Sequence, residues 1–121
     1  MIIKESAENY LEAILRLGEL KGDVRSIDIA EDLNISKPSV SVAMKNFREN
    51  GYVEVSREGY ITLTEKGFEI AKRTYLRHKL IKDFFVKIGV SPDTADSDAC
   101  KIEHDISDET YEKLEELYKT L

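Results

Sequence analysis

The 121-residue chain contains no tryptophan, only two prolines and a single cysteine, Cys100. One thiol cannot form an internal disulfide, which is the usual situation in a reducing compartment. No apolar run is long enough to cross a membrane, and the first residues lack the apolar stretch and cleavage site of a signal peptide. We therefore expect a cytoplasmic protein without a membrane partner.

Charge is distributed unevenly along a chain whose formal net charge is −6. Residues 34–82 contain ten Lys/Arg and five Asp/Glu, whereas residues 87–121 contain four basic and ten acidic residues. The basic middle can meet phosphates, and the acidic end suits a bound cation or a partner subunit. The length allows one compact domain or two small ones.

Apolar residues at helical spacing predict a first helix over residues 6–20. A short second helix is expected to begin with Ser26 as its cap, and Asn34 then opens a three-residue turn in a left-handed conformation. Ser36 caps a third helix that reaches residue 50. Its apolar residues Val40, Met44 (or Ala43) and Phe47 should face the core.

Alternating residues predict two strands, 52–55 and 60–63, joined by a turn that contains Gly59. A long helix over residues 65–88, another from Pro92 and a last one from Ser107 should follow. The predicted fold class is mainly α with a small β-hairpin.

Two helices joined by a short turn and followed by a hairpin form a winged helix-turn-helix, whose second helix enters the major groove. Hydroxyls and cations can contact bases and phosphates. The candidate DNA-binding residues are Ser36, Lys37, Pro38, Ser39, Ser41, Lys45, Arg48 and, at the hairpin tip, Arg57. A solvated helical surface or a protein-binding module is the alternative, and the basic balance favours DNA.

A single reading helix makes few base contacts, so recognition of double-stranded operator DNA usually requires two of them. The apolar helices after residue 65 exceed what the reading unit needs for its own packing. They are therefore the expected dimerisation surface of a homodimer.

Cys100, Glu103 and His104 stand at positions i, i+3 and i+4, so on a helix all three project from one face. A thiol, a carboxylate and an imidazole together suit a divalent transition metal. His78 lies on the apolar stripe of the long helix, and Glu12 lies beside that of the first. Singly, such residues are more often core or solvated side chains.

Asn9 precedes Glu12 by three residues and shares its helix face. Beyond these residues, the chain resembles the diphtheria toxin repressor and manganese transport regulator family of metal-dependent repressors. The matching stretches are residues 7–12, 27–40, 63–67, 77–78 and 100–107. The resemblance implies a winged helix-turn-helix DNA-binding domain over residues 1–72. It also implies an all-helical metal-binding and dimerisation domain over residues 73–121.

By the same resemblance, Cys100, Glu103 and His104 match the activating-site trio, and Glu12 and His78 match ligands of the manganese branch. Asn9 stands where the branches have methionine or aspartate, so its role stays open. Two positions of a secondary site hold Lys82 and Asp96, and a protonated lysine is no ligand.

Thiolate with imidazole favours Fe²⁺, Co²⁺, Ni²⁺ or Zn²⁺, so Fe²⁺ is the expected cofactor. Mn²⁺ is the second candidate, because Glu12 and His78 keep a manganese-type arrangement. The expected function is metal-dependent repression of metal-homeostasis genes by an operator-bound homodimer. The alternative is a metal-independent winged-helix dimer. No hydrolase motif is present, so we expect neither an enzyme nor an organic small-molecule substrate.

Overall fold

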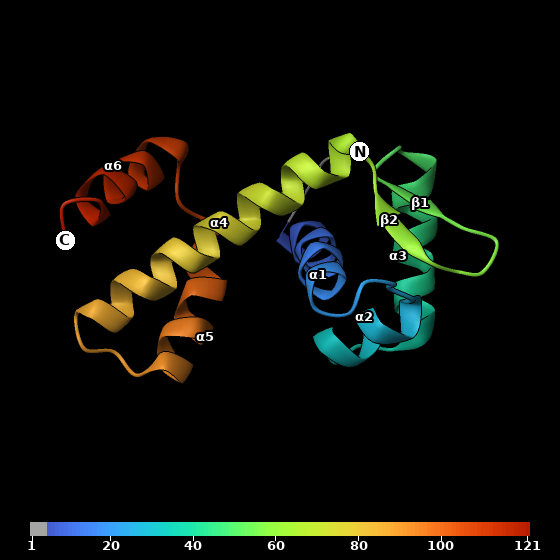
Figure 1. The fold of residues 1–121 in the computed structure, drawn as a ribbon, viewed down its shortest axis with the longest axis horizontal. Coiled ribbons are helices and arrows are strands. Elements are labelled where there is room, and N and C mark those ends of the chain that lie inside the picture. Colours follow the sequence, from blue (N-terminus) through green and yellow to red (C-terminus); the bar gives the residue numbers. More distant parts are fainter. Residues whose placement is uncertain (1–4) are drawn as a thin grey trace. The chain divides into compact units, whose positions relative to one another are not determined.

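The computed structural model describes residues 5–121. These residues form two compact units, one ending at Arg73 and the other comprising Thr74–Leu121. The long helix α4 (Glu65–Lys87) begins in the first unit and continues into the second (Figure 1). The predicted fold class, mainly helical with one small hairpin, is confirmed.

The first unit contains three helices and a two-stranded antiparallel hairpin before α4 begins (Figure 1). Its elements are α1 (Glu5–Lys21), α2 (Ser26–Leu33), α3 (Lys37–Glu49), β1 (Val53–Val55) and β2 (Ile61–Leu63). In the hairpin, Val53 pairs with Leu63 and Val55 pairs with Ile61. Helix–turn–helix followed by a hairpin is therefore the observed order.

The core of the first unit is an apolar cluster to which every one of these elements contributes. Its buried members include Leu11, Ile29, Val40, Phe47 and Val53. The predicted inward stripe of the third helix is confirmed, because Val40, Met44 and Phe47 are all buried. Burial of such side chains is the main force that fixes α3 on the unit.

The turn before α3 follows the prediction, whereas the start of α2 does not. Asn34 has a left-handed backbone, with φ of 54°, and the Ser36 hydroxyl accepts from the Ser39 N–H at 3.3 Å. Ser26 is not a cap but the first residue of α2. The amide before the helix, that of Arg25, donates instead to the Asp28 carboxylate at 2.8 Å. An acid three residues into a helix thus replaces the expected serine.

The start of α4 is tied to the hairpin. The Thr64 hydroxyl donates to the Gly51 carbonyl at 2.6 Å and accepts from the Gly67 N–H at 3.2 Å. A Cβ atom on Gly67 would lie 2.0 Å from the carbonyl oxygen of Tyr52. Only glycine permits this close backbone approach.

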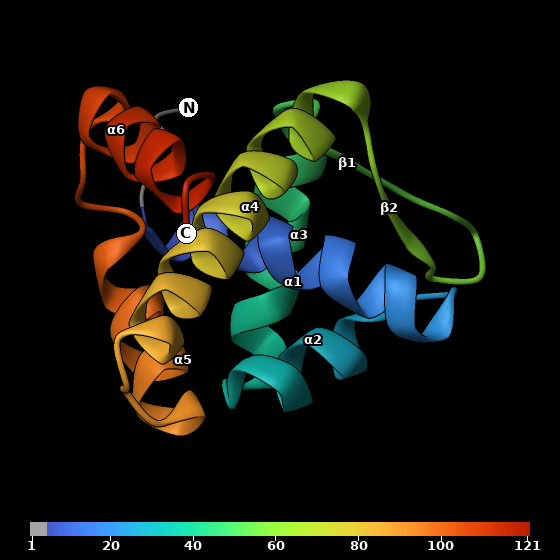
Figure 2. The same ribbon diagram turned by 60° about the vertical axis from the view of Figure 1, so that its left-hand side comes forward.

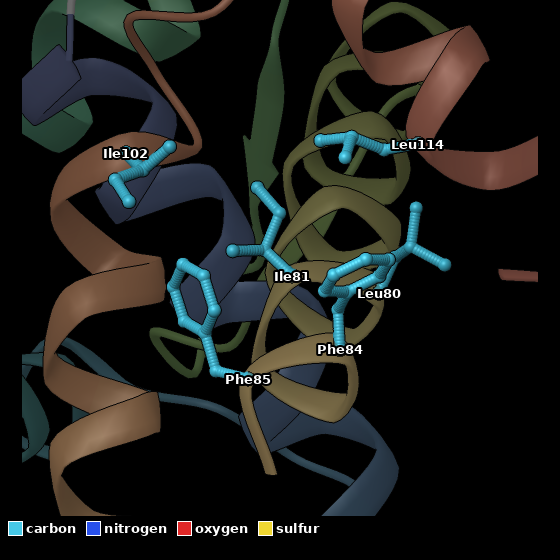
Figure 3. A pocket seen from close by; sticks show the side chains of 6 residues that line it. All are labelled: Leu80, Ile81, Phe84, Phe85, Ile102 and Leu114. Carbon is cyan, nitrogen blue, oxygen red and sulfur yellow. The ribbon is translucent and has the colours of Figure 1, made fainter. Parts of the chain in front are cut away.

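The second unit consists of the rest of α4 with α5 (Pro92–Ile102) and α6 (Asp108–Tyr118), drawn in yellow to red in Figure 2. An apolar hollow of about 100 Å³ opens among these helices. Figure 3 shows its lining: Leu80, Ile81, Phe84, Phe85, Ile102 and Leu114. Within residues 5–121, no helix combines the length and apolar character needed to span a membrane.

Candidate metal centre and nucleic-acid interface

Glu103 is the centre of a buried polar cluster in the second unit. Its carboxylate is only 1% exposed, and its Oε2 lies 2.7 Å from Nδ1 of His78. Its other oxygen, Oε1, lies 3.3 Å from Nε2 of His104, whose side chain is also buried. The fold therefore brings together three of the predicted metal ligands, although His78 precedes the other two by about 25 residues.

The His78 ring also reaches a second carboxylate, because its Nε2 lies 2.8 Å from Oδ1 of Asp96 on α5. Hydrogen bonding to Glu103 is the largest cause that raises the pKa of His78 to about 9, and the bond to Asp96 adds to it. The same bond lowers the pKa of Asp96. At neutral pH His78 is thus an imidazolium that donates both N–H groups to carboxylates.

The helix expected to carry Cys100, Glu103 and His104 ends before the trio is complete. Helix α5 stops at Ile102, and Glu103 forms its C-cap with a backbone N–H that donates to the Ala99 carbonyl. His104 lies in the turn that follows, and Cys100 is exposed. The three residues therefore do not all lie within one helix, because His104 follows the C-cap residue Glu103.

Arg77, next to His78 on α4, closes this turn, and the sequence pattern did not predict a role for it. It is 4% exposed and donates to the carbonyls of Glu103 at 3.2 Å and Ile106 at 2.9 Å. It also donates to the carboxylate of Asp108 at the start of α6. The sequence carries one signal for this position, its spacing: Arg77 stands three residues after Thr74 and four before Ile81, and the structure shows all three buried.

Glu12 and Asn9 belong to α1 in the first unit. The Glu12 carboxylate accepts from Nε of Arg16 at 3.1 Å, and the same guanidinium donates to both oxygens of Asp32 on α2. The bond to Asp32 is the largest cause that raises the pKa of Arg16. In this unit Glu12 is part of an ion-pair network that fastens α1 to α2.

The donor set of the second unit fits a divalent transition metal in its chemistry, because imidazole and carboxylate are ligands of such ions. Between residues 5 and 121, no group of three or more His, Cys, Asp and Glu side chains has the geometry of a metal site. The carboxylate of Glu103 is paired with the two rings instead. Imidazoles that share protons with carboxylates become ligands when those protons leave.

The candidate DNA-reading residues of α3 and its N-cap Ser36 are all exposed. The Ser36 and Ser39 hydroxyls are hydrogen-bonded to one another at 2.7 Å and remain exposed, as do Lys37 and Pro38. Arg57 is exposed in the hairpin turn. Val42 and Asn46 of α3 are exposed as well and were not among the predicted residues.

Ser41, Lys45 and Arg48 of α3 line a shallow hollow of about 200 Å³. Its remaining lining residues are Ser26, Met44 and Val55. Two cations and two hydroxyls around one hollow suit a phosphate group.

Two family models together match nearly the whole chain. Residues 3–61 match the iron-dependent repressor N-terminal DNA-binding domain. Residues 64–121 match the iron-dependent repressor metal-binding and dimerisation domain. The proteins of this family are transcriptional regulators, not enzymes.

Among individual relatives, an uncharacterized HTH-type transcriptional regulator from Methanocaldococcus jannaschii is 40% identical, covering 93% of this chain and 91% of that protein. The transcriptional regulator MntR of Escherichia coli O157:H7 is 33% identical, covering 88% and 69%. A solved structure, a manganese-dependent transcriptional repressor in complex with manganese, matches with a TM-score of 0.85 and 27% identity. The match covers 93% of this chain and 52% of that one, so the chain spans about half of its length.

Proposed function

Because the chain belongs to the iron-dependent repressor family of metal-dependent transcriptional regulators, we propose that it binds operator DNA as a cytoplasmic homodimer when loaded with Fe²⁺ or Mn²⁺. The operator-bound dimer represses metal-homeostasis genes. In this proposal residues 1–72 read DNA, and residues 73–121 bind the metal and dimerise. The observation that carries it is the buried Glu103 carboxylate held between His78 and His104.

The proposed metal ligands are His78, Cys100, Glu103 and His104, joined by Glu12 on the strength of the family resemblance alone. Asn9 is the one further candidate. These residues would hold a divalent ion, which would supply positive charge next to the buried Glu103 carboxylate. His78 must first release its proton, which Glu103 and Asp96 now hold in place.

The choice of metal rests on two opposed arguments. The thiol of Cys100 favours Fe²⁺ over Mn²⁺, because Mn²⁺ prefers oxygen ligands. A relative named MntR and a neighbouring structure in complex with manganese favour Mn²⁺. Titration calorimetry of the chelator-treated protein with Mn²⁺, with Zn²⁺ and, without oxygen, with Fe²⁺ would rank the three.

Support for the homodimer comes from the apolar surface of the second unit. The hollow of Figure 3 is lined only by apolar side chains. Leu76 and Leu117 of the same unit are exposed as well. Apolar surface of this kind is typical of a subunit interface. Sedimentation velocity with and without Mn²⁺ measures the oligomeric state directly.

The test of the function starts with selection of a duplex from a random library by the Mn²⁺-loaded protein. A mobility-shift titration then compares chelated, Mn²⁺-loaded and Fe²⁺-loaded protein on that duplex. We expect at least tenfold tighter binding with metal, because coupling of metal and DNA requires each to favour the same state. Equal affinity with and without either metal would refute the metal-dependent function.

A matched pair of variants locates the effect. Glu103→Gln keeps the size of the side chain and removes the buried negative charge, so the metal response should be lost. Glu109→Gln changes an exposed acid on α6 and should leave the response intact. A Glu103→Gln protein that still responds fully to metal would remove Glu103 from the site.

The alternative is a winged-helix dimer that reads DNA without metal. The hydrogen bonds that already satisfy Glu103 favour it. Cys100→Ala separates the two: it should weaken metal-stimulated DNA binding in a sensor, whereas in a metal-independent reader it should leave DNA affinity unchanged.

A further inference from the structure

Val42 occupies the middle of the exposed side of α3. The buried stripe of this helix consists of Val40, Met44 and Phe47. At 3.6 residues per turn, Val42 lies about half a turn away from that stripe. Its side chain is 63% exposed. The most outward position of the reading helix is therefore held by a branched apolar side chain.

The neighbours of Val42 along the helix face are compact or polar. Pro38 and Asn46 stand four residues before and after it, and Ser39 and Lys45 stand three residues before and after it, so all four surround it on the surface. All four are exposed. Val42 itself cannot form a side-chain hydrogen bond, whereas the polar residues around it can.

Val42 could be covered by nucleic acid or by an apolar protein surface. The charges of α3 favour nucleic acid. The helix carries Lys37, Lys45 and Arg48 and one acid, Glu49. Lys45 and Arg48 also line the hollow that suits a phosphate. Cations beside the hollow complement a polyanion and would place Val42 against the floor of a groove.

Among the groups that bases present in the major groove, the C5-methyl group of thymine is the apolar one. Guanine, adenine and cytosine present acceptors and donors, which would lose water against Val42 without gaining a hydrogen bond. We propose that Val42 packs on the methyl group of a thymine in each half-site and so selects thymine at that position. This inference rests on the proposed DNA-binding function and adds one determinant of its sequence specificity.

The test uses the Mn²⁺-loaded full chain and the duplex that it selects from a random library. Each thymine of that duplex is replaced in turn by deoxyuridine, which removes only the C5-methyl group. Fluorescence anisotropy then gives Kd for every duplex. Because one methyl contact is removed, we expect about fourfold weaker binding at one thymine position per half-site, and about fifteenfold with both half-sites replaced.

Two variants assign the effect to Val42. Val42→Ala removes the contacting methyl groups and should bind thymine and deoxyuridine duplexes equally. Val42→Thr keeps one γ-methyl group and the branched shape, so it should keep most of the discrimination. Leu20→Ala, which removes a 77% exposed apolar side chain from α1, is the matched control and should behave as the unmodified protein does. Circular dichroism checks that all variants fold.

The outcomes separate the two levels of inference. A selected duplex whose deoxyuridine versions all bind equally well would overturn the role of Val42 and leave DNA binding intact. Undiminished discrimination by Val42→Ala would do the same. If the loaded protein selects no duplex at all, the proposed function fails, and the inference about Val42 fails with it.

Discussion

Replacing Arg77 by methionine removes a buried cation and keeps the unbranched, apolar stem of the side chain, which ends before the position of the guanidinium. One nitrogen, Nη1, donates to the carbonyls of Glu103 and Ile106, and Nη2 donates to the carboxylate of Asp108. The guanidinium also lies 5.0 Å from the centre of the Tyr111 ring. One side chain thus supplies donors to the turn between α5 and α6.

The cost of Arg77→Met is worked out from the burial of each acceptor. The carbonyl of buried Glu103 would lose a donor, at about 1–3 kcal/mol, and half-buried Ile106 would lose less because water can reach it. The side chain of Asp108 is 72% exposed, so its carboxylate is rehydrated at little cost. We expect a loss of roughly 2–3 kcal/mol of stability. Arg77→Lys should lose about half of that, because an ammonium cannot reproduce the planar fork.

Arg77→Met should weaken metal binding as well as lower the stability. The turn that Arg77 closes carries Glu103 and His104, and groups that orient ligands typically change metal affinity by about 10- to 100-fold. Competition with a chromophoric chelator measures Mn²⁺ affinity, and urea unfolding measures stability. Hydrogen exchange should accelerate at residues 103–108 and much less at α3. Lys79→Met, an exposed cation of the same helix, is the control.

An Arg77→Met protein that retains full stability and slow exchange in the turn would refute the role of Arg77 in holding it. Equal effects of Arg77→Met and Arg77→Lys would show that hydrogen-bond geometry is unimportant. If hydrogen exchange accelerated equally throughout the chain, the substitution would destabilise the protein as a whole and not the turn in particular.

Two further predictions concern pH and backbone packing. The pKa of His78 is about 9 in the fold and 6.5 without it, so its bonds to two carboxylates stabilise the metal-free protein fully below pH 6.5 and are lost as the pH rises through 9. The free energy of unfolding of the chelated protein should fall by at most about 3 kcal/mol over that range. The His78→Gln protein should not show this fall. Identical dependence of stability on pH in the two proteins would contradict the raised pKa of His78. Gly67→Ala should cost about 2 kcal/mol or more in urea unfolding, because its Cβ would overlap the Tyr52 carbonyl. Gly18→Ala, whose Cβ meets only a side chain at 4.0 Å, should instead stabilise helix α1 by about 0.5–1 kcal/mol, and the opposite order would refute the packing argument.

Much of the local structure could be predicted because its causes lie within a few residues. The left-handed Asn34, the cap at Ser36 and the inward stripe of α3 depend on backbone preference and helical period. The prediction for the start of α2 was wrong, because a serine cap at Ser26 and an acid at Asp28 are alternative ways to satisfy the first turn. The choice of Asp28 over Ser26 depends on side-chain positions that residue type alone does not specify.

The candidate site was predictable as a set of residue types and less so as a geometry. The spacing of Cys100, Glu103 and His104 predicted a metal site on one helix, yet the helix ends at Ile102. Spacing at i, i+3 and i+4 does not itself show where a helix ends. The pairing of Glu103 with His78 spans 25 residues and depends on how α4 and α5 pack.

The order of helices and strands, the basic middle and the donor types near the C-terminus follow from the amino-acid sequence itself, since each reflects spacing or composition over short stretches. Only the packed structure determined that Glu103 lies between two imidazoles and that Arg77 is buried beneath their turn. These features depend on which surfaces exclude water, and burial is decided by elements that meet from distant parts of the chain.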